Sequence, residues 1–255
     1  MIDAFGLTGS EQLTCGCHVH IGVDSAEEAV AVLDRIRPWL APLLALSANS
    51  PFWHGTDSGY ASYRSQVWGR WPTAGPAGLF GSPRGYDAAV RAMLGTDTVL
   101  DEGMVYFDAR VSRAHPTVEI RVPDVCRDPD DAVLLAALAR ALVDTAAADW
   151  RAGLPPDPVR TEVLRLADWR AGRSGLTDVL VDPSGWGAAP AADVVGRVID
   201  HVTPALDDNG DLAVVRDLAA TVLRRGTGAT RQLDVRRRTG DLGAVVADAV
   251  AALDA

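Results

Sequence analysis

The chain has 255 residues, 48% of them hydrophobic, and carries 24 basic against 34 acidic side chains, for a formal net charge of −10. A chain of this length can bury one large core, so we expect one domain over residues 1–255. The negative charge argues against a nucleic-acid or anionic-membrane surface, and because every basic residue is arginine, a bound phosphate or carboxylate must be held by guanidinium, histidine, backbone amides or a metal.

The cysteine content and the N-terminal sequence point to a reducing compartment. Two of the three cysteines, Cys15 and Cys17, are one residue apart on the same face of a predicted strand, which is not a disulfide framework. The first residues lack a basic segment followed by an apolar run, and no stretch is long enough to span a bilayer. We therefore expect a cytoplasmic protein without a membrane or nucleic-acid partner.

The first predicted strand is CGCHVHIG at residues 15–22. Side chains alternate between the two faces of a strand, so His18 and His20 share one face, and Cys17, Val19 and Ile21 share the other. One side of this strand is therefore apolar and the other carries two imidazoles. This pattern predicts a sheet whose apolar face packs against helices and whose other face carries the functional side chains.

Two helices and an aromatic-rich segment are expected next. A capping box at residues 25–28 begins a helix, and prolines at 38 and 42 divide it from a second one that runs to about residue 48. After a turn-rich stretch comes YASYRSQVWGRWP at residues 60–72. Arg64 and Arg70 can clamp a phosphate or a substrate carboxylate there, with Trp68 and Trp71 as pocket walls. The alternative is a solvated helix face with buried aromatics.

A helix at about residues 84–95 precedes two further strands, at residues 104–112 and 118–124. In the second of these, valine and isoleucine occupy one face while Glu119 and Arg121 share the other. A hairpin between these strands would bring Asp108 or Arg110 close to Glu119 and Arg121. Asp124, which follows a proline, either orients an arginine or caps the next turn.

The second half of the sequence predicts helices and an α+β fold overall. A long helix over residues 132–150 opens with acidic residues that suit its dipole. Further helices are expected at about residues 155–172, 191–203, 210–225, 229–238 and 241–253, with a loop through residues 180–185. The run RRGTGATRQ, which contains Arg225 and Arg231, is either an anion site at a helix start or an ordinary loop-to-helix junction.

His18, His20, Glu119 and Arg121 are the strongest candidate site residues. Two histidines on one strand can reach one metal ion or one polyphosphate, and a carboxylate on a neighbouring strand begins a hard-cation site. The alternative is that they are satisfied polar groups of the core. Zinc is disfavoured, because Cys17, His18 and His20 cannot all face one ion on a regular strand.

Five motifs together resemble the glutamate-cysteine ligase type 2 family of ATP-dependent carboxylate-amine ligases, which is related to glutamine synthetase. They are CGCHVHIG, YASYRSQVWGRWP, ANSPFW at residues 48–53, VEIRVPD at residues 118–124 and RGTGATRQ at residues 225–232. The resemblance implies an α+β fold like the glutamine synthetase catalytic domain. Such a domain has a curved antiparallel sheet backed by helices, here followed by a largely helical C-terminal half.

The resemblance also implies residue roles and a reaction that uses ATP and Mg²⁺. It makes His18 and Glu119 metal ligands, His20 a nucleotide or substrate contact, and Arg121 a phosphate contact. The arginines predicted for the substrate carboxylates are Arg64 and Arg70, and those predicted for the nucleotide are Arg225 and Arg231. ATP would phosphorylate the γ-carboxylate of glutamate, and the amine of cysteine or another amine would attack the acyl phosphate to give an amide.

One family feature is missing from the sequence. Family members normally begin with a further segment that carries a Gly-x-Glu-Glu-Glu run, which supplies acidic metal ligands, and no such run occurs here. We therefore expect a domain truncated at its N-terminus, with a metal site short of carboxylates and an exposed sheet edge. Two other functions stay open: a noncatalytic remnant that binds nucleotide or assembles through that edge, as in a homo-oligomer, and a hydrolase with His18, His20 and Glu119 around one metal ion.

Overall fold

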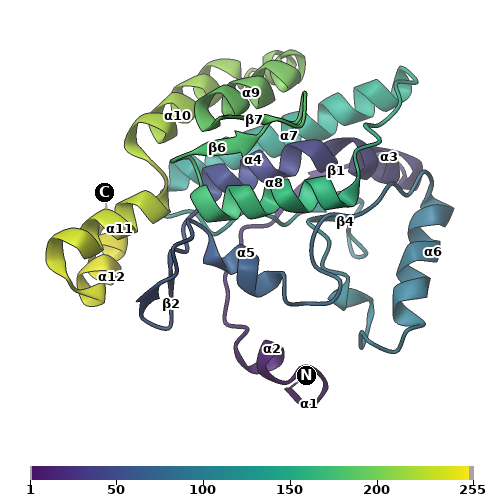
Figure 1. Cartoon of the computed structure of the whole chain (residues 1–255). Helices are drawn as coiled ribbons and strands as arrows, with labels where there is room; N and C mark the ends of the chain where they lie inside the picture. The colour runs from purple at the N-terminus through teal and green to yellow at the C-terminus, as the bar shows by residue number, and fades with distance from the viewer. Residues whose placement is uncertain (1, 253–255) are drawn as a thin grey trace.

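The computed structural model describes residues 2–252, which form an α+β structure with helices on one side of a small central sheet (Figure 1). The strands are β1 (Val19–Gly22), β2 (Phe52–Trp53), β3 (Thr56–Asp57), β4 (Ala109–Val111), β5 (Thr117–Ile120), β6 (Val179–Val181) and β7 (Ala188–Pro190). The helices of the first half are α1 (Ile2–Phe5), α2 (Leu7–Ser10), α3 (Ala26–Ile36), η1 (Arg37–Trp39), α4 (Leu40–Ser47), α5 (Tyr63–Trp68), α6 (Pro83–Leu94) and η2 (Glu102–Met104). Those of the second half are α7 (Pro129–Arg151), α8 (Thr161–Ser174), α9 (Ala191–Asp208), α10 (Leu212–Arg225), α11 (Gly228–Thr239) and α12 (Leu242–Ala251).

The central sheet has the strand order β1-β5-β4, and both pairings are antiparallel. The predicted hairpin between β4 and β5 is confirmed. The first of its strands is shorter than the predicted residues 104–112, because residues 102–104 form a 3-10 turn and only Ala109–Val111 pair with β5. Within residues 2–252, β1 and β4 are the outer strands of this sheet.

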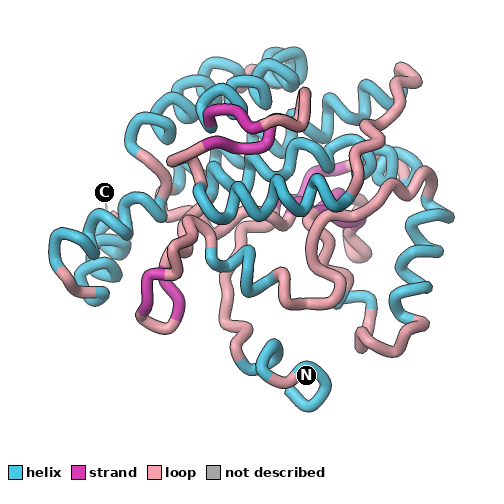
Figure 2. The backbone as a smooth tube through the Cα atoms, viewed as in Figure 1, coloured by secondary structure: helices cyan, strands magenta, loops and turns pink. Residues whose placement is uncertain are grey.

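Helices cover the apolar face of the sheet. Helix α3 packs on β4 and β5, and α7 packs on β1, so the three strands rest on a helical layer that Figure 2 shows above them. Val118 and Ile120 of β5 are fully buried under these helices. Because side chains alternate along a strand, Glu119 between them faces away from the helical layer.

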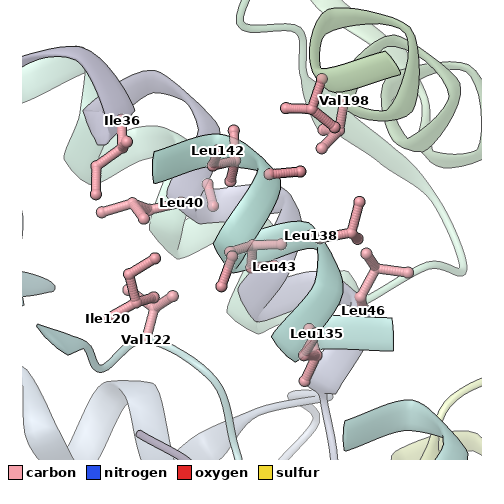
Figure 3. Packing of buried hydrophobic residues seen from close by; sticks show 14 of the residues in the cluster. Ile36, Leu40, Leu43, Leu46, Ile120, Val122, Leu135, Leu138, Leu142 and Val198 are labelled. Carbon is pink, nitrogen blue, oxygen red and sulfur yellow. The ribbon is translucent and has the colours of Figure 1, made fainter. Parts of the chain in front are cut away.

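The core lies between these helices, as Figure 3 shows. Leu138 at its centre is fully buried on α7, whose middle contributes a continuous apolar stripe. Helix α9 packs against the far side of α7, so α7 has protein on both sides. Other buried members of the cluster are Ile36, Leu40, Leu43, Leu46, Ile120, Val122, Leu135, Leu142 and Val198.

Local sequence signals account for several helix starts. The side chain of Ser25 accepts a hydrogen bond from the backbone N–H of Glu28, as the capping-box prediction requires. Asp128 caps α7 by accepting from the N–H of Asp130, and Pro129 occupies the first helical position, where no N–H is needed. The expected division is confirmed at Pro38, which lies in η1 between α3 and α4. Pro42 does not divide the helices, because it lies in the first turn of α4, where a missing N–H is tolerated.

Two predicted segments of the second half differ from the structure. Helix α8 begins at Thr161 and not near residue 155, because three prolines between residues 155 and 158 disfavour helical geometry before them. The predicted loop at residues 180–185 overlaps a short hairpin, β6 with β7, whose Leu180 is buried. The remaining helices are confirmed with small shifts of their ends, and residue 253 of the last one lies outside the described residues.

Helices α11 and α12 form a separate pair at one end of the molecule (Figure 1). The start of α11 lies directly against the loop after α4, because a Cβ atom added at Gly228 would lie 2.0 Å from Asn49 Oδ1. Gln232 donates to both oxygens of Asn49, which fixes the first turn of α11 there. No helix in the part of the chain that the structure describes is long and apolar enough to cross a membrane.

Candidate functional site

Three polar side chains form a row across the central sheet. His20 of β1 lies opposite Glu119 of β5, which in turn lies opposite Arg110 of β4. Arg110 Nε is 2.7 Å from Glu119 Oε2, and His20 Nε2 is 3.8 Å from Glu119 Oε1. The other ring nitrogen of His20 lies 3.0 Å from Thr117 Oγ1. The expectation that strand pairing brings Arg110 next to Glu119 is confirmed.

Glu119 also joins two side chains from the ends of the strands. Arg121, just after β5, donates from Nη1 to Glu119 Oε1. His18, just before β1, places its Nδ1 3.0 Å from the same oxygen. Glu119 is only 4% exposed, whereas 36% of the His18 side chain is accessible. The structure thus gathers His18, His20, Glu119 and Arg121 around one buried carboxylate that is open to solvent through its histidines.

The charges of this cluster favour an anion. Burial lowers the pKa of His18 from 6.5 to about 4, with a further contribution from Arg121, so this imidazole is neutral near pH 7. Burial pushes the pKa of Glu119 up, but the hydrogen bond from Arg110 and the charge of Arg121 outweigh it and leave the pKa below its usual range. The cluster therefore has one negative carboxylate and two positive guanidinium groups. The excess positive charge favours binding of a phosphate or carboxylate ligand.

The same cluster offers few free ligands to a metal ion. No group of three or more His, Cys, Asp or Glu side chains within residues 2–252 is arranged to hold an ion. Glu119 is the only carboxylate in the cluster, and both of its oxygens are bonded to arginine. Mg²⁺ beside a nucleotide is commonly held by one or two carboxylates, phosphate oxygens and water. These residues are therefore suited to Mg²⁺ that is already coordinated by phosphate oxygens, and not to the ion alone.

A cleft of about 440 Å³ opens beside the cluster, between α5, the strand ends and α8. Its walls include Arg64, Arg70, Trp68 and Trp71, the four residues that the sequence placed in one pocket. The cleft communicates with the sheet through Arg121, whose guanidinium carbon lies 5.7 Å from the centre of the Trp68 ring. This cation–π contact helps to hold Arg121 at the boundary between the cleft and the sheet.

Arg64 and Arg70 differ in what their guanidinium groups do. Arg64 is buried and donates to the carbonyl oxygens of Arg121 and Val122, both at 3.0 Å. It therefore fixes the backbone at the end of β5. Arg70 is about one-third exposed and, among the described residues, pairs only with Glu11, at 2.8 Å. Of the two, Arg70 is the one whose charge is available to a ligand.

Asp124 organises the base of the cleft. It is 1% exposed, and its Oδ1 lies 3.6 Å from Arg64 Nη1, so it orients an arginine, one of the two roles considered from the sequence. Its carboxylate also accepts from the Asn49 N–H and from the hydroxyl groups of Ser50 and Ser62. Burial raises the pKa of Asp124 despite these donors.

Arg225 and Arg231 lie elsewhere, near α11. Arg225 Nη2 is 2.5 Å from Asp131 Oδ1, and Arg231 is bonded to both carboxylate oxygens of Asp248. Neither residue is among those that line the cleft. The structure does not bring these two arginines to the sheet cluster.

Sequence reasoning missed one part of the cleft wall, which α8 supplies. Asp168 and Arg165 of α8 face the cleft together with Asp108, which precedes β4. Asp108 was predicted to lie near Glu119, and its backbone oxygen does accept from the Arg121 N–H, but its side chain belongs to the cleft. No local pattern distinguishes Asp168 from other polar residues of an amphipathic helix, so its place in the cleft could not be predicted.

Comparisons with known proteins agree on one family. The model of the family described as Glutamate-cysteine ligase family 2 (GCS2) matches residues 1–248. A protein of Paenarthrobacter aurescens named "Putative glutamate–cysteine ligase 2-1" is 55% identical over 97% of this chain, and "Putative glutamate–cysteine ligase 2" of Streptomyces coelicolor is 56% identical over 98%. The chain spans 64% and 69% of the lengths of these two relatives.

Two solved structures share the fold at low sequence identity. Glutamate–cysteine ligase of Francisella tularensis, solved with AMP, has a TM-score of 0.64 and 12% identity, covering 90% of this chain and 58% of that one. The Pup ligase PafA, solved with ADP, has a TM-score of 0.50 and 14% identity, covering 93% of this chain and 55% of that one. The expected antiparallel sheet backed by helices is thereby confirmed.

Proposed function

Because this chain belongs to glutamate-cysteine ligase family 2, we propose that it carries the phosphate-binding face of an ATP-dependent carboxylate-amine ligase. The observation that carries the proposal is the cluster around Glu119, in which Arg110 and Arg121 each bond one carboxylate oxygen beside a neutral His18. This arrangement offers guanidinium groups to phosphate oxygens. The whole reaction, its substrates and a cytoplasmic location are part of the proposal.

The proposed reaction forms an amide in two steps. The γ-phosphoryl group of ATP passes to the γ-carboxylate of glutamate, and the amine of cysteine or a similar amine then displaces phosphate from the acyl phosphate. Charge grows on the transferring phosphoryl oxygens, and pre-positioned arginines stabilise such charge without reorganising. We assign this role to Arg121, which Glu119 and the Trp68 ring hold in place. His20 is the proposed neighbouring contact to nucleotide or substrate.

Magnesium is proposed to arrive with ATP. When bound, it would neutralise phosphate charge. His18 and Glu119 are the side chains that would hold it, provided that the two arginines exchange the carboxylate for phosphate oxygens. Arg70, together with the buried Arg64, is the proposed contact for substrate carboxylates. Arg225 and Arg231 stay proposed nucleotide contacts, each of which would have to exchange its aspartate for phosphate.

An isotope experiment tests the reaction. The chain is incubated with ATP, Mg²⁺, cysteine and glutamate labelled with ¹⁸O in the γ-carboxylate, and the products are analysed by mass spectrometry. An acyl phosphate intermediate transfers one ¹⁸O atom to inorganic phosphate and yields ADP. Label in AMP would contradict it by indicating an acyl adenylate. The reaction without cysteine is the control for amide formation.

A noncatalytic nucleotide-binding protein is the second candidate. The observation that favours it is the occupation of both Glu119 oxygens by arginine, which leaves the cluster without a free carboxylate. The same isotope experiment separates the two candidates when it is combined with an ATP-binding measurement. Tight ATP binding without any labelled phosphate supports the second candidate.

A further inference from the structure

The cleft contains two carboxyl groups to which the proposed function gives no role, Asp108 and Asp168. They come from different elements, since Asp108 precedes β4 and Asp168 lies in the middle of α8. Both line the 440 Å³ cleft, and Arg121 lines the same cleft while reaching the phosphate-binding face. The two carboxyl groups are therefore positioned beside the place where an acyl phosphate would form.

The two carboxyl groups lie close enough in the cleft for each to affect the pKa of the other. Asp168 Oδ2 is closed off from solvent and receives no N–H or hydroxyl donor from the described part of the chain. Burial raises the pKa of both groups, and the charge of Asp108 raises that of Asp168 further. Two neighbouring carboxyl groups resist being ionised together, so the pair favours the state that keeps one proton and one negative charge.

The cleft also contains donors that lack acceptors within residues 2–252. Arg64 Nε, Trp71 Nε1 and Arg121 Nε are buried and have no hydrogen-bond partner within residues 2–252. These three side chains are 6%, 3% and 6% exposed, and all of them line the cleft. A buried N–H group without an acceptor is costly, so a ligand that supplies acceptors fits there. A cleft with free donors and a negative carboxyl pair suits a ligand that has both a carboxylate and an ammonium group.

We propose that Asp108 and Asp168 together receive the ammonium group of the amine substrate and take up its proton. The inference rests on the proposed function, because it assigns the amine to the cleft beside the phosphate-binding face. Either carboxyl group can hold the negative charge while the other holds the shared proton. The pair therefore acts as one proton acceptor.

The chemical step balances as follows. The ammonium group gives one proton to the pair, which becomes neutral, and the nitrogen gains a free electron pair. That electron pair forms the C–N bond at the acyl carbon, while the bond from this carbon to the phosphate oxygen breaks and its electrons leave with phosphate. The second N–H proton passes to the departing phosphate, and the products are an amide and hydrogen phosphate.

The charged groups that face the pair set its response to pH. Arg64 of α5 and Arg165 of α8 both lower the pKa of Asp108, and Arg165 also lowers that of Asp168. Burial outweighs them, and the pair takes up its second proton as the pH falls below neutral. Affinity for an ammonium group should then fall, because the pair has lost its charge.

The test compares two ligands that differ by one amino group, L-cysteine and 3-mercaptopropionate. Their binding to the full chain is measured by titration calorimetry at pH 7 and pH 5.5, for the wild type, Asp108→Asn, Asp168→Asn and the double variant. In each single variant the remaining carboxyl group ionises, so cysteine affinity should stay within about threefold of wild type. The double variant has no charge and should bind cysteine roughly tenfold or more weakly, with 3-mercaptopropionate unaffected.

The inference would be overturned if the wild type does not prefer cysteine to 3-mercaptopropionate, or if the double variant retains this preference. It would also be overturned if the double variant loses affinity for both ligands equally. A solely structural pair would give the last result. ATP titration of the same samples reports on the phosphate-binding face independently. Absence of ATP binding by the wild type therefore counts against the proposed function. A wild type that binds ATP but does not prefer cysteine counts only against the role of the carboxyl pair.

Discussion

Glu119 is the residue that determines the chemistry of the sheet face. Its carboxylate holds Arg110 and Arg121 in position and lies 3.0 Å from His18. A substitution at Glu119 should therefore change the positions of these side chains. A guanidinium paired with carboxylate is also ready to pair with phosphate, since both present oxygen acceptors in similar geometry. The cluster therefore has a resting state in which Glu119 occupies the place that an anion would take.

His18 provides a direct measure of this charge balance. Its pKa in the folded protein should be about 4, because burial and Arg121 both oppose protonation. The NMR chemical shift of the imidazole Hε1 proton checks this value over pH 3–8, and His18→Gln identifies the resonance. Binding of ATP or inorganic phosphate should raise the pKa, because an anion stabilises the imidazolium. A pKa near 6.5 in the free protein would contradict the described surroundings.

The same shift predicts how stability depends on pH. The unfolded chain takes up a proton on His18 near pH 6.5, whereas the folded chain does so only near pH 4. Protonation in that interval therefore favours the unfolded state, and His18 lowers the stability as the pH falls from about 6.5 to about 4. Urea unfolding at pH 7 and pH 5 should show a smaller loss for His18→Gln than for wild type, and an equal loss would contradict the prediction.

Gly16 is predicted to be required for the position of Arg64. A Cβ atom at residue 16 would lie 2.2 Å from Arg64 Nη2, so Gly16→Ala should displace this guanidinium from the two carbonyl oxygens that it bonds. We expect a loss of about 1–3 kcal/mol in the free energy of unfolding, measured with urea. Gly22→Ala is the matched control, because its Cβ meets no atom within 4 Å. Equal stability of the two variants would contradict this role of Gly16.

At the scale of elements, Asp124 joins the ends of β5, α4 and α5. It accepts from Ser50 and Ser62, and its own N–H donates to Ser47. Three segments that lie far apart in the sequence thereby meet at one buried carboxylate. The cleft depends on this junction, because the same carboxylate orients Arg64 at its base.

Replacement of Asp124 should therefore affect both stability and the cleft. Asp124→Asn puts an NH₂ group where a carboxylate oxygen now accepts hydrogen bonds, so a buried donor is left without an acceptor. We expect a loss of about 1–3 kcal/mol in urea unfolding. Asp207→Asn, at an exposed position on α9, serves as the control and should change stability by less than about 0.5 kcal/mol. Similar values for the two variants would show that the junction is not needed.

Elements with a clear period were predictable from the sequence. The alternation in residues 15–22 identified the histidine face of β1, and the alternation at residues 118–122 identified Glu119 and Arg121, because a strand has a side-chain period of two. The β6–β7 hairpin was not predicted, because each of its strands has only three residues, too few to show an alternating pattern. Helix α8 begins at Thr161, later than its helical spacing of apolar residues predicts, because the prolines before Thr161 disfavour a helix there.

The site was predictable only where its residues share a strand or neighbouring strands. His18, His20, Glu119 and Arg121 could be grouped in this way. Asp108 and Asp168 could not, because their proximity depends on how α8 packs against α4 and α5, which no local pattern specifies. The aspartates that pair with Arg225 and Arg231 also belong to tertiary packing and were not visible in the sequence.

At the scale of the whole molecule, a basic face is set in an acidic protein. The chain has a net charge of −10, yet the sheet cluster has more guanidinium groups than carboxylates. Helices α3 and α7 pack on the other face of the sheet (Figure 1). Solvent reaches the cluster through the side chains of His18 and His20, which are 36% and 39% exposed. Binding of a polyphosphate should therefore depend on the arginines of this face and not on the overall charge.

Titration calorimetry with ATP in the presence of Mg²⁺ tests this claim most directly. Wild-type chain is compared with Arg121→Gln and with Arg113→Gln, a control at an arginine that is 69% exposed and pairs with Glu102. We predict that the wild type binds ATP, that Arg113→Gln binds equally well, and that Arg121→Gln binds roughly tenfold or more weakly. ATP binding by Arg121→Gln as tight as that of the wild type would contradict the assignment of the sheet face as the phosphate site.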